Sequence, residues 1–186
     1  MFSLSQRFQT LGNQAITYGL FISVFIAITS WFQLQSQDAD LVPSTIESIK
    51  PSLSFRTSRY YGSVNGKPKE NAKITFDLET DLTPLFTWNT KQVFAYLTAE
   101  YDGKNTHNEV VFWDRIITSK DEAHLKVNGA KSKYNIWDAQ DKLSGKELEF
   151  KLKWNIQPYV GPLIYGETIG SKDVLVQSAA ADDDNK

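Results

Sequence analysis

The chain contains no cysteine among its 186 residues. That absence excludes disulfide bonds, thiolate metal sites and cysteine nucleophiles together. A strong positive charge is also missing, since the formal net charge is -2 and the isoelectric point is about 5.7. We therefore expect no nucleic acid among the partners, because binding through a basic surface requires clustered lysine and arginine.

Recognisable catalytic motifs are missing as well. There is no HExxH, GxSxG or phosphate-binding loop motif, and the two histidines, His107 and His124, lie in a predicted turn and a predicted solvated connection. Asp77 and Glu79 alternate with apolar residues, so we interpret them as the solvated face of a strand rather than a calcium site or a catalytic pair. The sequence predicts no catalytic residue, no metal site and no cofactor. An enzyme with His107 or His124 as its base is kept as an alternative.

One long apolar run is present near the N-terminus. Ala15 to Phe32, AITYGLFISVFIAITSWF, contains no charge and no proline. As a helix, this run would be about 27 Å long, which matches the apolar thickness of a thin bilayer. The run predicts one membrane-spanning helix over residues 15–32.

The flanking charges predict its orientation. Arg7 precedes the run, and the next basic residue is Lys50. The excess of positive charge on the cytosolic side of membrane helices then leaves residues 1–14 in the cytosol and the remainder of the chain on the other side. A cleaved secretory signal is the alternative. The run is longer than the usual apolar core of about 7–15 residues in such signals, and it ends in the bulky pair Trp31 and Phe32.

Small side chains recur at every fourth position of this run. A helix would align them in one stripe, formed by Ala15, Gly19, Ser23 and Ala27. Such stripes allow a neighbouring membrane helix to approach closely, so these four residues are candidate helix contacts. The alternative is that the stripe only reflects the ordinary abundance of small residues in membrane helices.

Beyond the apolar run the pattern changes to alternation. In Lys146 to Gln157, KELEFKLKWNIQ, apolar residues occupy every second position, as in a half-buried strand, and the same holds around Ile74, Phe76 and Leu78. Gln92 to Tyr101 is apolar on both sides, as in a central strand, and Val110 to Thr118 repeats that character. Weaker strands are predicted at 53–60, 134–137 and 163–169, with Val174 and Val176 beyond the last of these.

These strands, separated by turn-forming pairs such as Asn128-Gly129, predict an all-β fold. We expect an antiparallel β-sandwich over residues 33–178, preceded by the one transmembrane helix. Residues 179–186, AAADDDNK, are predicted to be a disordered acidic tail.

Four segments of the sequence resemble, in order, the motifs of one known family. They are DLTPLFTWNTKQVFAYLTAEY at 81–101, NEVVFWDRII at 108–117, Lys133-Tyr134, and WNIQPYVG at 154–161. The chain is similar to the third-subunit family of the eukaryotic signal peptidase complex, and the resemblance covers essentially its whole length. One departure is that the chain has no Asn-x-Ser/Thr glycosylation acceptor, which family members often carry.

The resemblance implies a non-catalytic, scaffolding subunit of the endopeptidase that removes signal peptides at the endoplasmic reticulum membrane. It implies a single-pass type II topology with a lumenal domain. The implied partners are a catalytic serine protease subunit, other small membrane subunits and the lipid bilayer, with the translocon as a further candidate.

A candidate lumenal contact loop lies inside the longest motif. Its residues are Pro84, Leu85, Phe86, Trp88 and Asn89. Exposed aromatic side chains between two strands are typical of contact loops, but a loop folded back over the end of the sandwich is an equal alternative. An alternative for the whole protein is a stand-alone, membrane-anchored lumenal module that binds a glycan or a peptide by itself.

Overall fold

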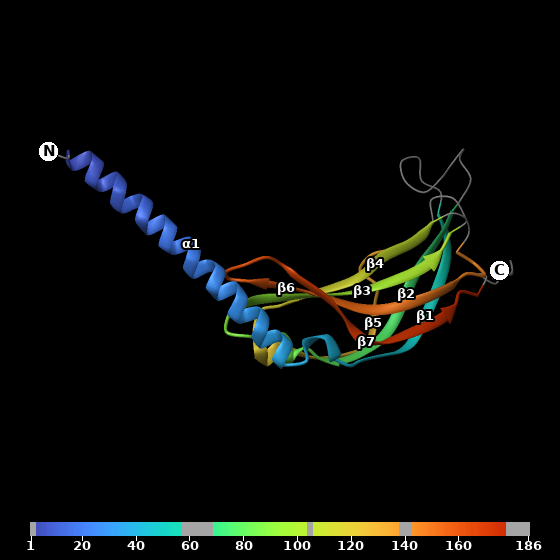
Figure 1. The fold of residues 1–186 in the computed structure, drawn as a ribbon. Coiled ribbons are helices and arrows are strands. Elements are labelled where there is room, and N and C mark those ends of the chain that lie inside the picture. Colours follow the sequence, from blue (N-terminus) through green and yellow to red (C-terminus); the bar gives the residue numbers. More distant parts are fainter. Residues whose placement is uncertain (1–2, 57–68, 104–105, 138–142, 178–186) are drawn as a thin grey trace, which may run out of the picture.

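The computed structural model describes residues 3–56, 69–103, 106–137 and 143–177 (Figure 1). In this part of the chain one long helix precedes seven strands, and three short 3-10 turns connect some of them. The elements are α1 (Leu4–Ser36), η1 (Ala39–Leu41), β1 (Ser44–Arg56), β2 (Lys69–Asp81), η2 (Thr83–Leu85), β3 (Thr90–Asp102), β4 (His107–Ile117), η3 (Lys120–Glu122), β5 (His124–Lys131), β6 (Glu147–Pro158) and β7 (Ile164–Leu175).

The strands form two sheets that pack face to face. One sheet has the order β1-β2-β5 and the other the order β4-β3-β6-β7, and every pairing within them is antiparallel. This arrangement confirms the predicted antiparallel β-sandwich preceded by one apolar helix. Strand β3, which contains the segment predicted to be central, lies between β4 and β6.

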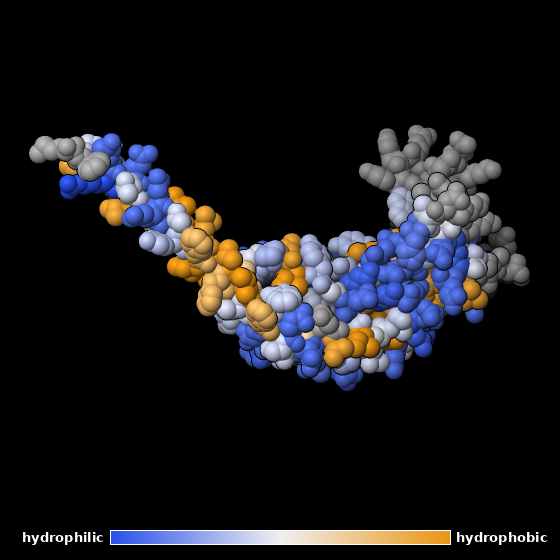
Figure 2. All heavy atoms as spheres, in the orientation of Figure 1, coloured by the Kyte–Doolittle hydropathy of each residue, from blue (hydrophilic) through white to orange (hydrophobic). Residues whose placement is uncertain are grey.

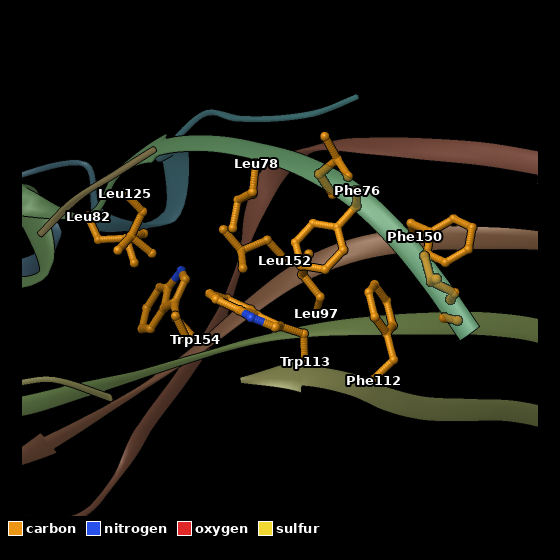
Figure 3. Close-up of a cluster of buried hydrophobic side chains, with 14 of the residues drawn as sticks. Phe76, Leu78, Leu82, Leu97, Phe112, Trp113, Leu125, Phe150, Leu152 and Trp154 are labelled. Atoms are coloured by element: carbon orange, nitrogen blue, oxygen red, sulfur yellow. The ribbon is translucent and has the colours of Figure 1, made fainter. Parts of the chain in front are cut away.

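The core lies between the sheets and follows the predicted alternation. The five apolar positions of β6 are buried, as are the three predicted apolar positions of β2: Leu148, Phe150, Leu152, Trp154, Ile156, Ile74, Phe76 and Leu78. Phe76 packs edge-on against Phe112 and Trp113, with ring centroids 5.5 and 5.7 Å apart (Figure 3). Edge-to-face pairs of this kind stabilise cores beyond the burial of their area.

Helix α1 is longer than the predicted membrane span at both ends. Ser3 caps its first turn by accepting a hydrogen bond from the Gln6 N–H, and Gln6 bonds back to Ser3. The helix is long and apolar enough to cross a membrane, and its apolar side chains are mostly exposed. Its last turns differ, because Ser30 and Leu34 are buried. Figure 2 shows apolar side chains gathered along the half of α1 that meets the sandwich.

Three details of the strand pattern differ from the sequence predictions. Strand β4 is an edge strand with an exposed Ile116, although its sequence is apolar on both sides like that of β3. The sequence did not predict strand β5 or residues 44–52 of β1. Around Tyr134 the structure contains only a single bridge, between Ala72 and Ile136. The predicted tail and residues 57–60 lie outside the described residues.

Candidate functional site

The end of the sandwich nearest the N-terminus is built where two loops meet helix α1. One loop connects β2 to β3 and includes η2, and the other, residues 159–163, connects β6 to β7 and is called here the β6–β7 loop. Gly161, at the tip of this loop, has a φ of +121°, and a Cβ added there would lie 3.3 Å from the Cβ of Ala27. Glycine therefore allows both the backbone conformation and the close approach of the loop to the helix.

Asn89 joins the two loops. Its side-chain amide donates to the Val160 carbonyl at 2.7 Å, and its Oδ1 accepts from the Val160 N–H at 3.1 Å. Its own carbonyl accepts from the Tyr159 N–H at 2.8 Å. Asn89 is 2% exposed, so these bonds are made away from water and fix the tip of the β6–β7 loop.

The predicted contact loop is only partly available at the surface. Leu85 and Asn89 are buried, and Pro84 and Phe86 are half-buried. Trp88, by contrast, is 60% exposed. The loop thus covers one end of the core and presents one large aromatic side chain. Its role in contacting a partner stays a prediction, which now rests on Trp88.

The predicted stripe of small residues lies on one face of α1. Ala15 and Gly19 are exposed, and Ser23 is half-buried with its hydroxyl donating to the Gly19 carbonyl at 2.8 Å. Ala27, the last member, packs against the chain's own Gly161. A contact of the first three residues with another helix stays a prediction.

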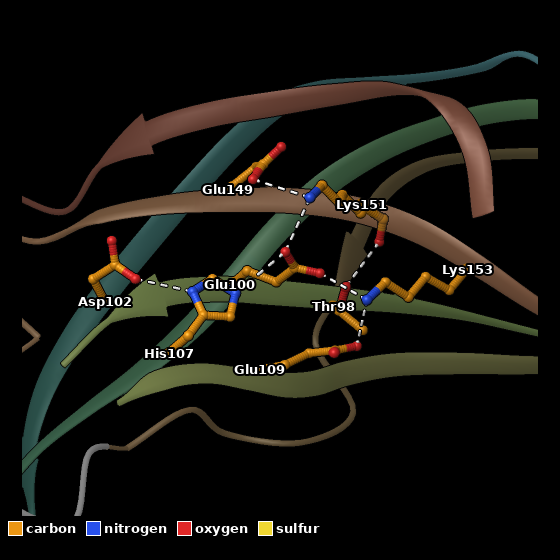
Figure 4. A network of polar contacts seen from close by, with 8 residues as sticks. All are labelled: Thr98, Glu100, Asp102, His107, Glu109, Glu149, Lys151 and Lys153. Atoms are coloured by element: carbon orange, nitrogen blue, oxygen red, sulfur yellow. Dashed lines mark hydrogen bonds and ion pairs between the residues drawn. The ribbon is translucent and has the colours of Figure 1, made fainter. Parts of the chain in front are cut away.

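A network of charged side chains covers the other end of the four-stranded sheet (Figure 4). The pairing register places Glu109, Glu100 and Glu149 side by side on β4, β3 and β6. Such a row of like charges would be destabilising alone. Two lysines offset most of this charge. Lys153 contacts Glu100 at 2.7 Å and Glu109 at 2.8 Å, and Lys151 contacts Glu100 at 3.0 Å and Glu149 at 3.1 Å.

The network changes the proton affinities of its members. Burial by itself would raise the pKa of Glu100, but the hydrogen bonds from Lys153 and Lys151 outweigh it and lower that pKa to about 2. Burial would likewise lower the pKa of Lys153, but its hydrogen bonds with Glu100 and Glu109 raise it. Glu100 is therefore ionised at neutral pH, so this network is an arrangement of paired charges rather than a proton donor awaiting a substrate.

His107 belongs to the same network. The sequence predicted a turn at this residue and did not predict its contacts. Its Nδ1 lies 2.9 Å from an oxygen of Asp102, and its Nε2 lies 3.6 Å from Glu100. The hydrogen bond with Asp102 raises the pKa of His107. His124 begins β5. Among the described residues no three histidine, aspartate or glutamate side chains are grouped as a metal would require.

The chain is thus a β-sandwich joined to one apolar helix. The two surfaces described above are the loops that meet this helix and the outer face of the four-stranded sheet. That architecture is of the class in which a β-sandwich domain is attached to one helix long and apolar enough to cross a membrane. The family model described as "Signal peptidase subunit" matches residues 1–179. The chain belongs to this family, and it is a non-catalytic subunit of the signal peptidase complex.

Individual relatives support the same assignment. "Signal peptidase complex subunit 3" of Saccharomyces cerevisiae is 56% identical over 180 residues, which is 96% of this chain and 98% of the relative. The protein of the same name in Debaryomyces hansenii is 50% identical over 171 residues, 90% of each chain. The one in Homo sapiens is 42% identical over 97 residues, 50% of this chain and 54% of the relative.

Proposed function

We propose that this subunit is a scaffold that supports the lumenal domain of the complex's catalytic serine protease subunit. In this proposal α1 crosses the endoplasmic reticulum membrane with the N-terminus in the cytosol, and the sandwich lies in the lumen as a type II domain. Other small membrane subunits contact α1, and the translocon is a further candidate partner. The complex as a whole removes signal peptides from translocated proteins.

One structural observation carries the scaffold proposal. The last turns of α1 are part of the sandwich, because Leu34 belongs to the same apolar cluster as Val42 and Ile46. A contact made inside the membrane and a contact made outside it are therefore held in one fixed geometry. A flexible linker between the helix and the domain would not provide this.

The outer face of the four-stranded sheet supplies a surface for the second contact. Ile116, Phe94, Asn155 and Tyr165 form one row across β4, β3, β6 and β7. Ile116 is 53% and Tyr165 65% exposed, and Phe94 stacks on Tyr96 with ring centroids 5.4 Å apart. A row that is apolar or aromatic at three of its four positions and is bordered by the charged network is typical of a protein interface.

A pull-down of the full-length chain tests the proposal. The chain is tagged at its C-terminus and isolated in a mild detergent, its partners are identified by mass spectrometry, and cleavage of a signal peptide is assayed in the eluate. We expect a membrane serine protease and cleavage activity to co-purify. Replacing Gly19 by Leu should weaken the association, because Leu would hold a neighbouring helix away from the stripe.

The matched control is Val24→Leu, which enlarges an exposed side chain on another face of the same helix. Trp88→Ala tests the loop outside the membrane in the same assay. If the chain is isolated without partners and without activity, the scaffold proposal is wrong and the stand-alone binding module becomes the better explanation.

A further inference from the structure

The β6–β7 loop reaches along α1 toward the predicted membrane span. In Figure 1 the connection between β6 and β7 extends beside the helix, away from the helix's C-terminal end. Its tip, Gly161, contacts Ala27, nine residues before the end of α1 at Ser36, which corresponds to about 14 Å along the helix axis. Ala27 also lies five residues inside the predicted span of residues 15–32, so the tip of the loop lies beside the outer part of that span.

The composition of the loop suits such a position. No charged residue occurs between Lys153 and Glu167. Tyr159 is 69% and Leu163 48% exposed, which places large apolar surfaces outward on either side of the tip. Charged residues are equally absent between Asp81 and Lys91, the segment that carries the exposed Trp88.

The backbone of the loop also suits a region of low polarity. Unpaired N–H and C=O groups are costly near the apolar part of a bilayer. Pro158 and Pro162 have no N–H group, and the N–H groups of Tyr159 and Val160 are bonded to Asn89. The Val160 carbonyl is bonded to the same residue. Asn89 of one loop therefore satisfies three backbone polar groups of the other without water.

A shallow apolar groove joins the loop to the helix. It has a volume of about 240 Å³ and lies between Ala27, Trp31 and the Pro158–Ile164 segment. Trp31 is 50% exposed beside it. Tryptophan and tyrosine are enriched at the level of lipid headgroups, so Trp31, Trp88 and Tyr159 are the residue types expected at that depth.

We propose that the β6–β7 loop and Trp88 lie in the interfacial region of the bilayer leaflet on the side of the sandwich, with lipid covering Tyr159 and Leu163. The proposal rests on α1 crossing the membrane, as in the proposed function, and goes beyond it by assigning a second membrane contact to the folded domain. Lipid is favoured as the occupant because this surface is uncharged and continuous with the apolar surface of α1. Two attachments, the helix and the loop, would limit the tilting of the sandwich on the membrane.

The absence of native cysteine makes a direct test simple. Single cysteines replace Tyr159, Leu163 or Trp88 in the full-length chain and carry a nitroxide spin label. The chain is reconstituted alone into phosphatidylcholine vesicles, and collisions of the label with oxygen and with a water-soluble nickel complex are measured. Oxygen concentrates in the apolar part of the bilayer, whereas the nickel complex stays in water.

Two further positions calibrate the measurement. Phe21→Cys reports the predicted span, and Ser171→Cys, an exposed position on β7 beyond the loop, reports the aqueous side. We expect the ratio of oxygen to nickel collisions at Tyr159 and Leu163 to be several-fold above that at Ser171. The ratio at Trp88 should equal that of the two loop positions or lie between theirs and that of Ser171. Thermal unfolding by circular dichroism checks that each labelled chain is folded.

Three results would overturn the proposal. If the ratio of oxygen to nickel collisions at Tyr159 and Leu163 equals that at Ser171 while the ratio at Phe21 is high, the loop contact is wrong. The membrane-spanning helix is then still supported. If Phe21 is aqueous as well, both the span and the loop contact are wrong. Low collision rates with both oxygen and nickel at Tyr159 and Leu163 would indicate burial against protein instead of lipid.

Discussion

Glu100 places a nearly buried negative charge between Lys151 and Lys153, and this arrangement predicts a dependence of stability on pH. Its pKa is lowered from an ordinary 4.5 to about 2. The ionised form therefore contributes its stabilisation above pH 4.5, and this contribution is lost as the pH falls from 4.5 toward 2. Glu100→Gln should lower the free energy of unfolding by about 1–3 kcal/mol at neutral pH.

The measurement is thermal unfolding of the full-length chain in detergent, followed by near-ultraviolet circular dichroism over a series of pH values. The difference between wild type and Glu100→Gln should shrink as the solution is acidified through that range. Glu149→Gln is the matched control, because Glu149 contacts only one of the two lysines among the described ion pairs and is more exposed. A difference that stays constant down to acidic pH would contradict the assigned role of the carboxylate.

Gly166 is a second position where one atom matters. A Cβ added there would overlap the indole ring of Trp154, which is itself 1% exposed and cannot move into solvent. Gly166→Ala should therefore lower the free energy of unfolding by about 1–3 kcal/mol, as overpacking of a core does. Chemical denaturation followed by tryptophan fluorescence measures it. Ser171→Ala, on the exposed part of the same strand, should change little, and equal stability of the two variants would show that the packing is looser than described.

At the scale of single residues, the sequence identified which side chains form the core but not which loops touch. The alternation in β6 was sufficient to place Trp154 inside. The bond between Asn89 and Val160 joins positions 71 apart in the chain, and the contact of Gly161 with Ala27 joins the loop to the helix. No local pattern encodes such pairs. The pair Gly161-Pro162 indicated only a turn.

At the scale of elements, the sequence predicted strands best where one face is buried and the other wet. The sequence of β4 is apolar on both sides, and this pattern has two physical causes: burial between neighbouring strands, or an exposed face that a partner covers. The structure places β4 at an edge with Ile116 exposed, so the first cause does not apply there. Strand β5 alternates too weakly to be recognised, because its residues are mostly exposed.

The junction of α1 with the sandwich leads to a prediction about an element. Leu34 is 4% exposed within the domain core, whereas Leu20 on the same helix is 64% exposed. Leu34→Ala should lower the stability of the sandwich by about 2–5 kcal/mol, since it leaves a cavity in a packed core. Leu20→Ala removes the same atoms from a detergent-covered surface and should leave the sandwich unchanged. Thermal unfolding in detergent compares the two, and similar melting temperatures would mean that the helix is not part of the domain's folding unit.

At the scale of the whole molecule, the helix, the two loops that meet it and the exposed sheet face are held by one packed core. The helix is fixed to the core through Leu34, and the β6–β7 loop is fixed to the helix through Gly161. The apolar row on β4, β3, β6 and β7 is thereby held in a set orientation to the helix. For a partner with its own membrane helix and its own lumenal domain, the contact with α1 and the contact with the apolar row would have a constant spacing. A constant spacing favours a single mode of assembly.

The apolar row therefore predicts the effect of one charge on assembly. Ile116 is 53% exposed, so Ile116→Asp adds no buried charge to the isolated chain and should leave its melting temperature nearly unchanged. Within a protein interface, however, an unpaired carboxylate would be desolvated, and the loss of about 2 kcal/mol typical of a central contact weakens binding by more than tenfold. We expect the amount of co-purified protease and the cleavage activity to fall together. Ser171→Asp adds the same charge to the exposed β7 and serves as the control. If the protease co-purifies undiminished with the Ile116→Asp variant, the contact lies on another surface, and Trp88 is the next candidate.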